Sequence, residues 1–245
     1  MILETIVTTQ SHLGVVHIAP MGIHVMDDGT RLVMPFRPST TLENILATGC
    51  AVLNHTDDVR VFAGCLTGRR NWPLVDSVKV PVARLADSLS HVELELTRVE
   101  DHDLRPKLYC KVTHEANHVP FQGFNRAQYS VLEAAILVSR LQMLPWDKVE
   151  SELAYLRIGL DKCAGQREKE AWGWLMEKVE AHKNGMDGDN AVELTPSPNG
   201  GRSGWGQSID GETTDFTRPH PNPPPLGEGT GSLNSTALTD GGKHT

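Results

Sequence analysis

Residues 2–36 read ILETIVTTQSHLGVVHIAPMGIHVMDDGTRLVMPF, and this stretch decides the class of fold. β-Branched residues alternate with polar ones in 2–9 and again in 14–19, which is typical of half-buried strands. Asp27-Asp28-Gly29 is a strong hairpin turn, after which a short apolar strand follows. We expect Pro20-Met21-Gly22 to interrupt the second strand with a turn of small residues. The stretch therefore predicts an antiparallel meander.

The rest of the chain adds a second hairpin and then changes to helices. Alternation returns in 92–97 and 108–113, which predicts two long strands. From Asn125 onward the apolar residues recur at helical spacing, and further helices are expected over 148–163 and 166–183. The helix that begins at Asn125 is apolar on two sides, so we expect it to be covered on both. A second subunit is one candidate for that cover.

Composition divides the chain and excludes several classes of protein. Residues 187–245 hold half of the 22 glycines, so we expect a disordered Gly/Pro-rich tail over 185–245. The formal net charge of −8 argues against nucleic-acid binding, which needs a basic surface. Residues 5–26 lack charged side chains, but their histidines, threonines and proline argue against a membrane span.

The four cysteines and the N-terminus indicate a reducing compartment. No two cysteines form a Cys-x-x-Cys pair, so they are expected to be reduced and buried. The first residues carry no basic segment and no cleavage site of a signal peptide. We therefore expect a cytoplasmic protein.

The run Pro35-Phe36-Arg37-Pro38-Ser39-Thr40-Thr41-Leu42-Glu43-Asn44 is the most informative motif. Thr40-x-x-Glu43 fits a capping box, which predicts a helix that ends near Thr48 with Gly49 as its C-cap. A guanidinium, three hydroxyls and free helix amides within one turn suit a phosphate group. The alternative is an ordinary capped helix that follows a surface arginine.

Two other segments offer weaker ligand signals. Arg126 is expected in the first turn of the helix capped by Asn125, where a cation opposes the helix dipole unless an anion is bound nearby. The alternative is an exposed arginine. The turn expected at 20–22 would let backbone amides approach a planar ligand, and the alternative there is a strand bend.

Histidines and acidic residues do not indicate a metal. His12, His17, His24 and His55 are loosely clustered with Asp57 and Asp58, but their spacings fit no common site. Asp57 is expected to cap a short helix instead. The chain also has no dinucleotide fingerprint, no Walker loop and no nucleophile elbow, so a Rossmann enzyme, an NTPase and a hydrolase of that type are disfavoured.

Several runs together resemble an uncharacterised family of domains of unknown function. These runs are ETIVTT, HIAPMGI, PFRPSTTLENI, VLNHTDDVRVFA and FNRAQYSVLEAAILVSRL. Members of that family have the FMN-binding split β-barrel, similar to flavin reductases and pyridoxamine-phosphate-oxidase-like proteins. The resemblance covers about residues 1–183. It implies an α+β fold: an antiparallel split barrel over 1–123, a helical segment over 124–184 at the dimer interface, and the tail.

The resemblance also implies a cofactor site, since flavin lies at the homodimer interface in such barrels. Arg37, Ser39, Thr40, Thr41 and Asn44 would then hold the phosphate and ribityl chain of FMN. Met21 and Gly22 would line the isoalloxazine ring, and Asn54 would reach the flavin edge. Arg126 would complete the phosphate site, from the second subunit in one version.

The function implied is that of an FMN-dependent oxidoreductase acting as a homodimer on a small-molecule substrate or nicotinamide donor. No catalytic side chain is indicated, because the flavin itself carries the redox chemistry. Two alternatives stay open: a non-catalytic flavin-binding or carrier protein, and a split barrel that binds haem or a deazaflavin.

Overall fold

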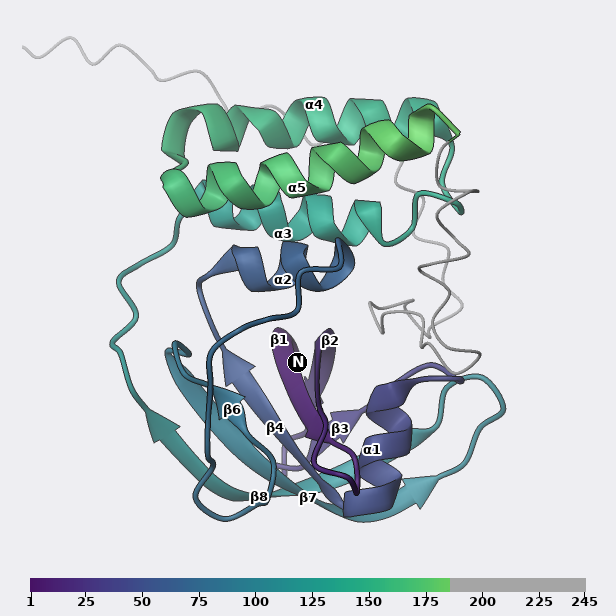
Figure 1. The fold of residues 1–245 in the computed structure, drawn as a ribbon, viewed down its shortest axis with the longest axis vertical. Coiled ribbons are helices and arrows are strands. Elements are labelled where there is room, and N and C mark those ends of the chain that lie inside the picture. The colour runs from purple at the N-terminus through teal and green to yellow at the C-terminus, as the bar shows by residue number, and fades with distance from the viewer. Residues whose placement is uncertain (186–245) are drawn as a thin grey trace, which may run out of the picture. The chain divides into compact units, whose positions relative to one another are not determined.

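The computed structural model describes residues 1–185, which form a barrel and a layer of helices (Figure 1). The elements in chain order are β1 (Ile2–Gln10), β2 (Val16–Val25), β3 (Arg31–Val33), α1 (Thr40–Thr48), β4 (Cys50–His55), α2 (Val59–Leu66), β5 (Leu74–Val75), β6 (Arg84–Leu85), β7 (Ser90–Glu100), β8 (Lys107–Asn117), α3 (Arg126–Val138), α4 (Trp146–Cys163) and α5 (Gln166–Lys183).

Six antiparallel strands close into a barrel in the order β1-β2-β3-β8-β7-β4. Strand β1 pairs with β2 along its whole length and with β4 over Ile6–Thr8, and this second pairing closes the barrel. Strands β5 and β6 form a separate small sheet in the segment between α2 and β7. The predicted antiparallel barrel followed by helices is confirmed.

Alternation along the strands gives the barrel two apolar faces. Inward residues such as Val7, Ile23 and Leu94 form one buried cluster, to which α1 adds Leu42 and Ile45. Outward residues of β1 and β2 form a second cluster with α2. Each hydrophobic face therefore has a cover, as an amphipathic strand requires.

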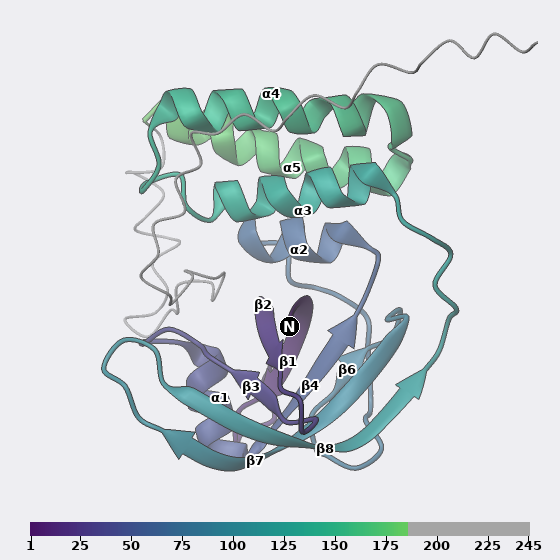
Figure 2. The same ribbon diagram turned by 180° about the vertical axis from the view of Figure 1, so that it is seen from behind.

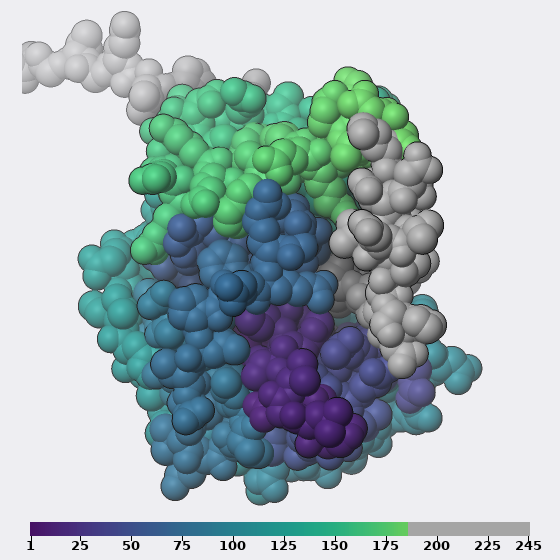
Figure 3. Space-filling model, in the orientation of Figure 1, coloured from purple at the N-terminus to yellow at the C-terminus, as the bar shows by residue number. Residues whose placement is uncertain are grey.

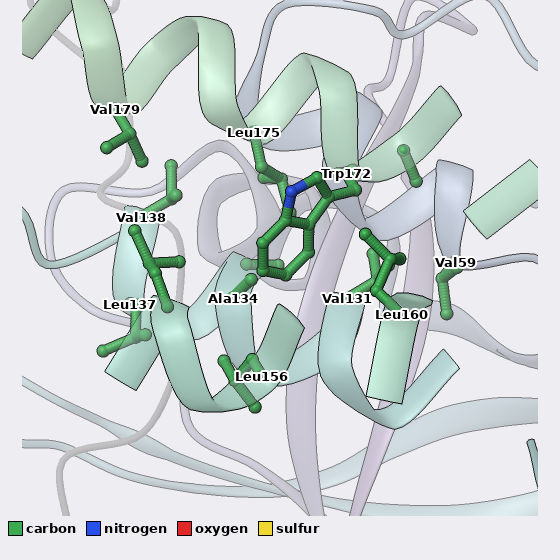
Figure 4. Packing of buried hydrophobic residues seen from close by; sticks show 14 of the residues in the cluster. Val59, Val131, Ala134, Leu137, Val138, Leu156, Leu160, Trp172, Leu175 and Val179 are labelled. Carbon is green, nitrogen blue, oxygen red and sulfur yellow. The ribbon is translucent and has the colours of Figure 1, made fainter. Parts of the chain in front are cut away.

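The helical layer has its own core, shown in Figure 4. Trp172 and Leu175 of α5 pack there against residues of α3 and α4 such as Ala134 and Leu156. Helix α2 also contributes Val59 to this cluster, although it precedes β7 in the chain. The 1–123 and 124–184 boundaries stay a prediction, and the helical layer includes α2.

The two-sided apolar helix α3 does not need a second subunit as cover. On one side it contacts α4 and α5, and on the other it contacts α2 (Figure 2). Leu132 and Ile136 pack against the cluster that α2 forms with β1 and β2. Helices α2, α4 and α5 thus cover both sides of α3 within one chain, and further cover by a second subunit stays a prediction.

The turn expected at Pro20-Met21-Gly22 is wrong, since β2 continues through all three residues. Pro20 lies opposite Ile6 in an unbroken register with β1. Strand β2 pairs with β3 only at its far end, so the other edge of β2 has no strand partner at Pro20. A residue without an N–H group is tolerated on such an edge.

Other local expectations are met or shift slightly. Helix α5 begins and ends where the periodicity predicts, whereas α4 begins two residues earlier, at Trp146. Asp58 rather than Asp57 caps α2, and its carboxylate accepts from the Arg60 amide. All four cysteines are free, although Cys50 and Cys163 are only partly buried.

Two expectations concern membranes and the tail. Among residues 1–185, no helix has the length and apolar character needed to cross a membrane. The predicted disordered tail, beyond Gly185, lies outside the described residues.

His17 on β2 gives the fold a testable pH dependence. Burial, with a smaller contribution from the charge of Arg70, lowers the pKa of His17 to about 4. Below about pH 6.5 the unfolded chain therefore binds a proton that the native state refuses, so stability falls as the pH drops from 6.5 to 4. In His17→Gln, the free energy of unfolding should fall by up to about 3 kcal/mol less over this pH range than in wild type. Urea unfolding at several pH values measures the difference.

The control for this experiment is His12→Gln, because His12 is exposed in the turn between β1 and β2. The control should keep the wild-type pH dependence. An unchanged dependence in His17→Gln would show that His17 does not resist protonation.

Candidate functional site

The N-terminus of α1 has two backbone amides without an acceptor in the described chain. Ser39, not Thr40, is the N-cap: its Oγ accepts from the Leu42 amide at 3.1 Å, and its carbonyl accepts from the Glu43 amide at 3.0 Å. The expected capping box on Thr40 is therefore wrong by one residue. The amides of Thr40 and Thr41 have no intrahelical acceptor at this end of a helix, and none binds them within residues 1–185. They remain available to an anion.

Arg37 lies beside this helix end and is held by the loop between β7 and β8. Its guanidinium pairs with Asp101, and its amide donates to the Leu104 carbonyl at 2.9 Å. Both side chains of the ion pair are exposed, and such pairs contribute roughly 0–1 kcal/mol. Exchange of Asp101 for a phosphate would therefore cost little.

The predicted phosphate residues divide into an outer and an inner group. Arg37 is exposed and Thr40 partly buried, whereas Ser39, Thr41 and Asn44 are buried. Asn44 Nδ2 donates to Thr9 Oγ1 at 3.0 Å, which fastens α1 onto β1. The outer group and the free amides fit a phosphate, while Asn44 positions the helix that carries them.

Met21 and Gly22 lie on opposite faces of β2. Met21 is 2% exposed and belongs to the cluster inside the barrel. Gly22 faces outward, where an added Cβ would lie 3.2 Å from Ile2 Cγ2 and 3.4 Å from Glu4 Oε1. Burial, followed by the charge of Glu133 on α3, raises the pKa of Glu4. Only Gly22 of the two therefore lies on the outer face of β2.

Asn54 is fully buried and its amide is occupied at both ends. Nδ2 donates to the Ile6 carbonyl at 3.0 Å and to Thr8 Oγ1 at 3.3 Å, and Oδ1 accepts from the Leu85 amide at 2.8 Å. These contacts join β1, β4 and β6. The arrangement serves the barrel closure and leaves no polar atom directed at a flavin edge.

Arg126 lies far from the other candidate residues within one chain. It is the first residue of α3, and Figures 1 and 2 show that α3 begins on the side of the molecule opposite α1. Its Nη2 lies 3.3 Å from Cys163 Sγ. Arg37 and Arg126 do not form one site unless a second chain brings them together.

Figure 3 shows where the N-terminal strands reach the surface, in purple. They lie between the segment that follows α2, in blue, and α1, in violet. The N-terminal strands and α1 thus reach neighbouring parts of one face.

The sequence patterns did not reveal a polar cluster on β7 and β8. His91 and Glu93 are 1% and 0% exposed, and His91 Nε2 lies 3.1 Å from Glu93 Oε1. His91 Nδ1 lies 2.9 Å from Nε2 of His118, and His114 lies against the His91 ring. The spacing of four between His114 and His118 was the available signal, but the strand register that adds the other two residues is not visible in a sequence.

Family models match most of the described chain. Residues 3–118 match the N-terminal domain of the proteins of unknown function called DUF447, and residues 125–177 match a second DUF447 model. No curated protein matches the sequence.

Solved structures match parts of the chain, and one match spans most of it. An FMN-bound DUF447 protein from Methanosarcina mazei has a TM-score of 0.62 and 23% identity, over 72% of this chain and 94% of that one. The 2-nitrobenzoate 2-nitroreductase of Pseudomonas fluorescens has a TM-score of 0.43 and 18% identity, over 47% and 64%. Flavoredoxin of Desulfovibrio vulgaris has a TM-score of 0.42 and 11% identity, over 47% of this chain and 69% of that one. The first match supports the fold.

The variant Asn54→Ala tests whether Asn54 stabilises the fold or binds the cofactor. It should lower the free energy of unfolding by about 1–3 kcal/mol, because the buried Leu85 amide loses its acceptor. Affinity for added FMN should stay within twofold of wild type, measured by fluorescence quenching. A selective loss of FMN affinity with unchanged stability would contradict this assignment. Asn117→Ala, at an exposed site on β8, is the control.

Proposed function

Since the chain belongs to the DUF447 family of proteins of unknown function, we propose that it is an FMN-binding oxidoreductase that acts as a homodimer. The observation that carries the proposal is the pair of free amides at Thr40 and Thr41 with Arg37 beside them. This arrangement suits a terminal phosphate, which FMN has. The FMN in the Methanosarcina relative supports the same cofactor.

In this proposal the phosphate accepts from the Thr40 and Thr41 amides and pairs with the Arg37 guanidinium. The Thr40 hydroxyl adds a donor, Ser39 caps the helix end, and Asn44 keeps α1 in place against β1. Gly22 remains the candidate for ring contact, because it adds no side chain to the outer face of β2, where Ile2 and Glu4 are its neighbours. Met21 and Asn54 are left out of the ring site for the reasons of burial and occupied hydrogen bonds given above.

FMN, when bound, supplies hydride and electron transfer. The chain's residues bind the phosphate, orient the ribityl chain and exclude water from the ring. The substrate is a small molecule or a nicotinamide donor. Haem and a deazaflavin are the competing ligands, and the mass of the ligand released by acid distinguishes them from FMN.

Dimerisation and a cytoplasmic location belong to the same proposal. Arg126 cannot join Arg37 within one chain, so a role for it at the phosphate needs a second subunit. The sedimentation mass of the protein tests this part directly. The four free cysteines are compatible with a reducing compartment.

Arg37→Ala should weaken FMN binding by about 1–3 kcal/mol, the range for a charge-assisted hydrogen bond. Titration followed by flavin fluorescence measures the change. Asp101→Asn is an informative companion variant, because it frees Arg37 from its ion pair and should bind FMN at least as tightly as wild type.

Arg157→Ala is the matched control, since Arg157 is an exposed arginine on α4 that pairs with Asp161. Equal FMN affinity in Arg37→Ala and Arg157→Ala would place the phosphate elsewhere.

An oxidoreductase should oxidise NADH or NADPH when FMN is present, or reduce its flavin with another donor. Loss of absorbance at the nicotinamide band, compared with free FMN alone, is the measurement. Bound FMN with no turnover of either nucleotide would remove the flavin-reductase version and favour the carrier alternative. Arg37→Ala should lose turnover in proportion to its lost FMN.

A further inference from the structure

Strands β7 and β8 bring three potential metal ligands together on the outer face of the barrel. Val92 and Leu94 point into the barrel, so His91 and Glu93, which alternate with them along β7, point outward. His114 lies opposite Glu93 in the register of β8. One ligand atom from each of His91, Glu93 and His114 lies within 4.8 Å of the others.

The carboxylate of Glu93 is held in a fixed position by backbone amides. Oε1 accepts from Val78 at 2.7 Å, and Oε2 accepts from Lys79 at 2.6 Å and Val80 at 2.9 Å. Glu93 is therefore a preorganised oxygen donor beneath the loop that covers β7.

His91 has the partner that a ligating histidine needs. Its Nε2 faces Glu93, and its Nδ1 lies 2.9 Å from Nε2 of His118. If Nδ1 carries the proton and donates to His118, then Nε2 has a free lone pair on the Glu93 side. A second-shell acceptor of this kind fixes the tautomer and orientation of metal-bound imidazoles.

We propose that His91 Nε2, Glu93 Oε1 and a ring nitrogen of His114 bind one divalent transition-metal ion. Two imidazoles and one carboxylate are a donor set typical of Zn²⁺ and Fe²⁺ sites, whereas Mg²⁺ and Ca²⁺ prefer oxygen ligands alone. Three protein ligands leave at least one coordination position for water or another ligand. His118 acts as a positioning residue for His91.

A purely structural hydrogen-bond network is the competing explanation. Glu93 already accepts three amides, so the network accounts for Glu93 and His91. It does not account for His114, whose ring nitrogens have no hydrogen-bond partner within residues 1–185 although they approach both other side chains. A shared cation gives all three side chains a reason to converge.

Zn²⁺ is the probe for the test, added to full-length, untagged protein after treatment with a chelator. Calorimetric titration should give one ion per chain, and His114→Ala should bind at least about tenfold more weakly. His118→Ala should weaken binding less than His114→Ala does. His12→Ala, at an exposed histidine in the β1–β2 turn, should bind as wild type.

Thermal unfolding provides the second readout, because an ion that binds only the native state raises the midpoint. Zn²⁺ should raise the midpoint of wild type and of His12→Ala by more than that of His114→Ala. Glu93→Gln is a poor test by itself, since losing the charge also weakens the covering loop. His114 is only partly buried, so its variants should fold.

The absence of stoichiometric Zn²⁺ binding to wild type, or equal binding by wild type and His114→Ala, would overturn the proposal. The titration is run with and without FMN, so a failure of the flavin proposal does not change its outcome. The metal site is therefore tested independently of the proposed function.

Discussion

The rest of the structure depends on the double pairing of β1, which has β2 on one edge and β4 on the other. This pairing closes the barrel and leaves β1 with two buried faces. The inner face packs in the barrel and receives α1 through the Asn44–Thr9 hydrogen bond. The outer face packs on α2, which connects the barrel to the helical layer. Asn54 reinforces the closure, since its buried amide joins β1, β4 and β6.

Local sequence patterns predicted a helix or strand well where a single local cause, such as helical periodicity, determined it. Helix α5 lies where helical spacing predicts it, over about 166–183. Strand β2 was predicted with a break because Pro20 and Gly22 are turn residues by themselves. The structure accommodates both: Pro20 has an unpaired edge, and Gly22 makes room for Glu4. The tertiary surroundings of Pro20 and Gly22 therefore outweighed their local turn propensity. A local sequence pattern does not show those surroundings.

The candidate site was predictable in its local part only. Arg37 and Ser39–Thr41 are close in sequence, so their place at the start of α1 follows from capping chemistry alone. The burial of Met21 and the hydrogen bonds of the Asn54 amide depend instead on the register of the barrel strands. The same holds for the histidine cluster, since Glu93 meets His114 only through the pairing of β7 with β8. Contacts between strands can be predicted only when the register of those strands is known.

Within residues 1–185, the backbone amides at the two proposed sites differ in whether the chain supplies them with an anion. The amides of Val78, Lys79 and Val80 converge on the carboxylate of Glu93, which the chain supplies from β7. At the start of α1, the nearby Asp101 binds Arg37, while the amides of Thr40 and Thr41 have no acceptor in the described chain. A helix end with this geometry attracts negative charge from outside. The physical asymmetry between the two groups is therefore the reason to look for the ligand's phosphate at α1, and for a cation at Glu93, where the negative charge is already in place.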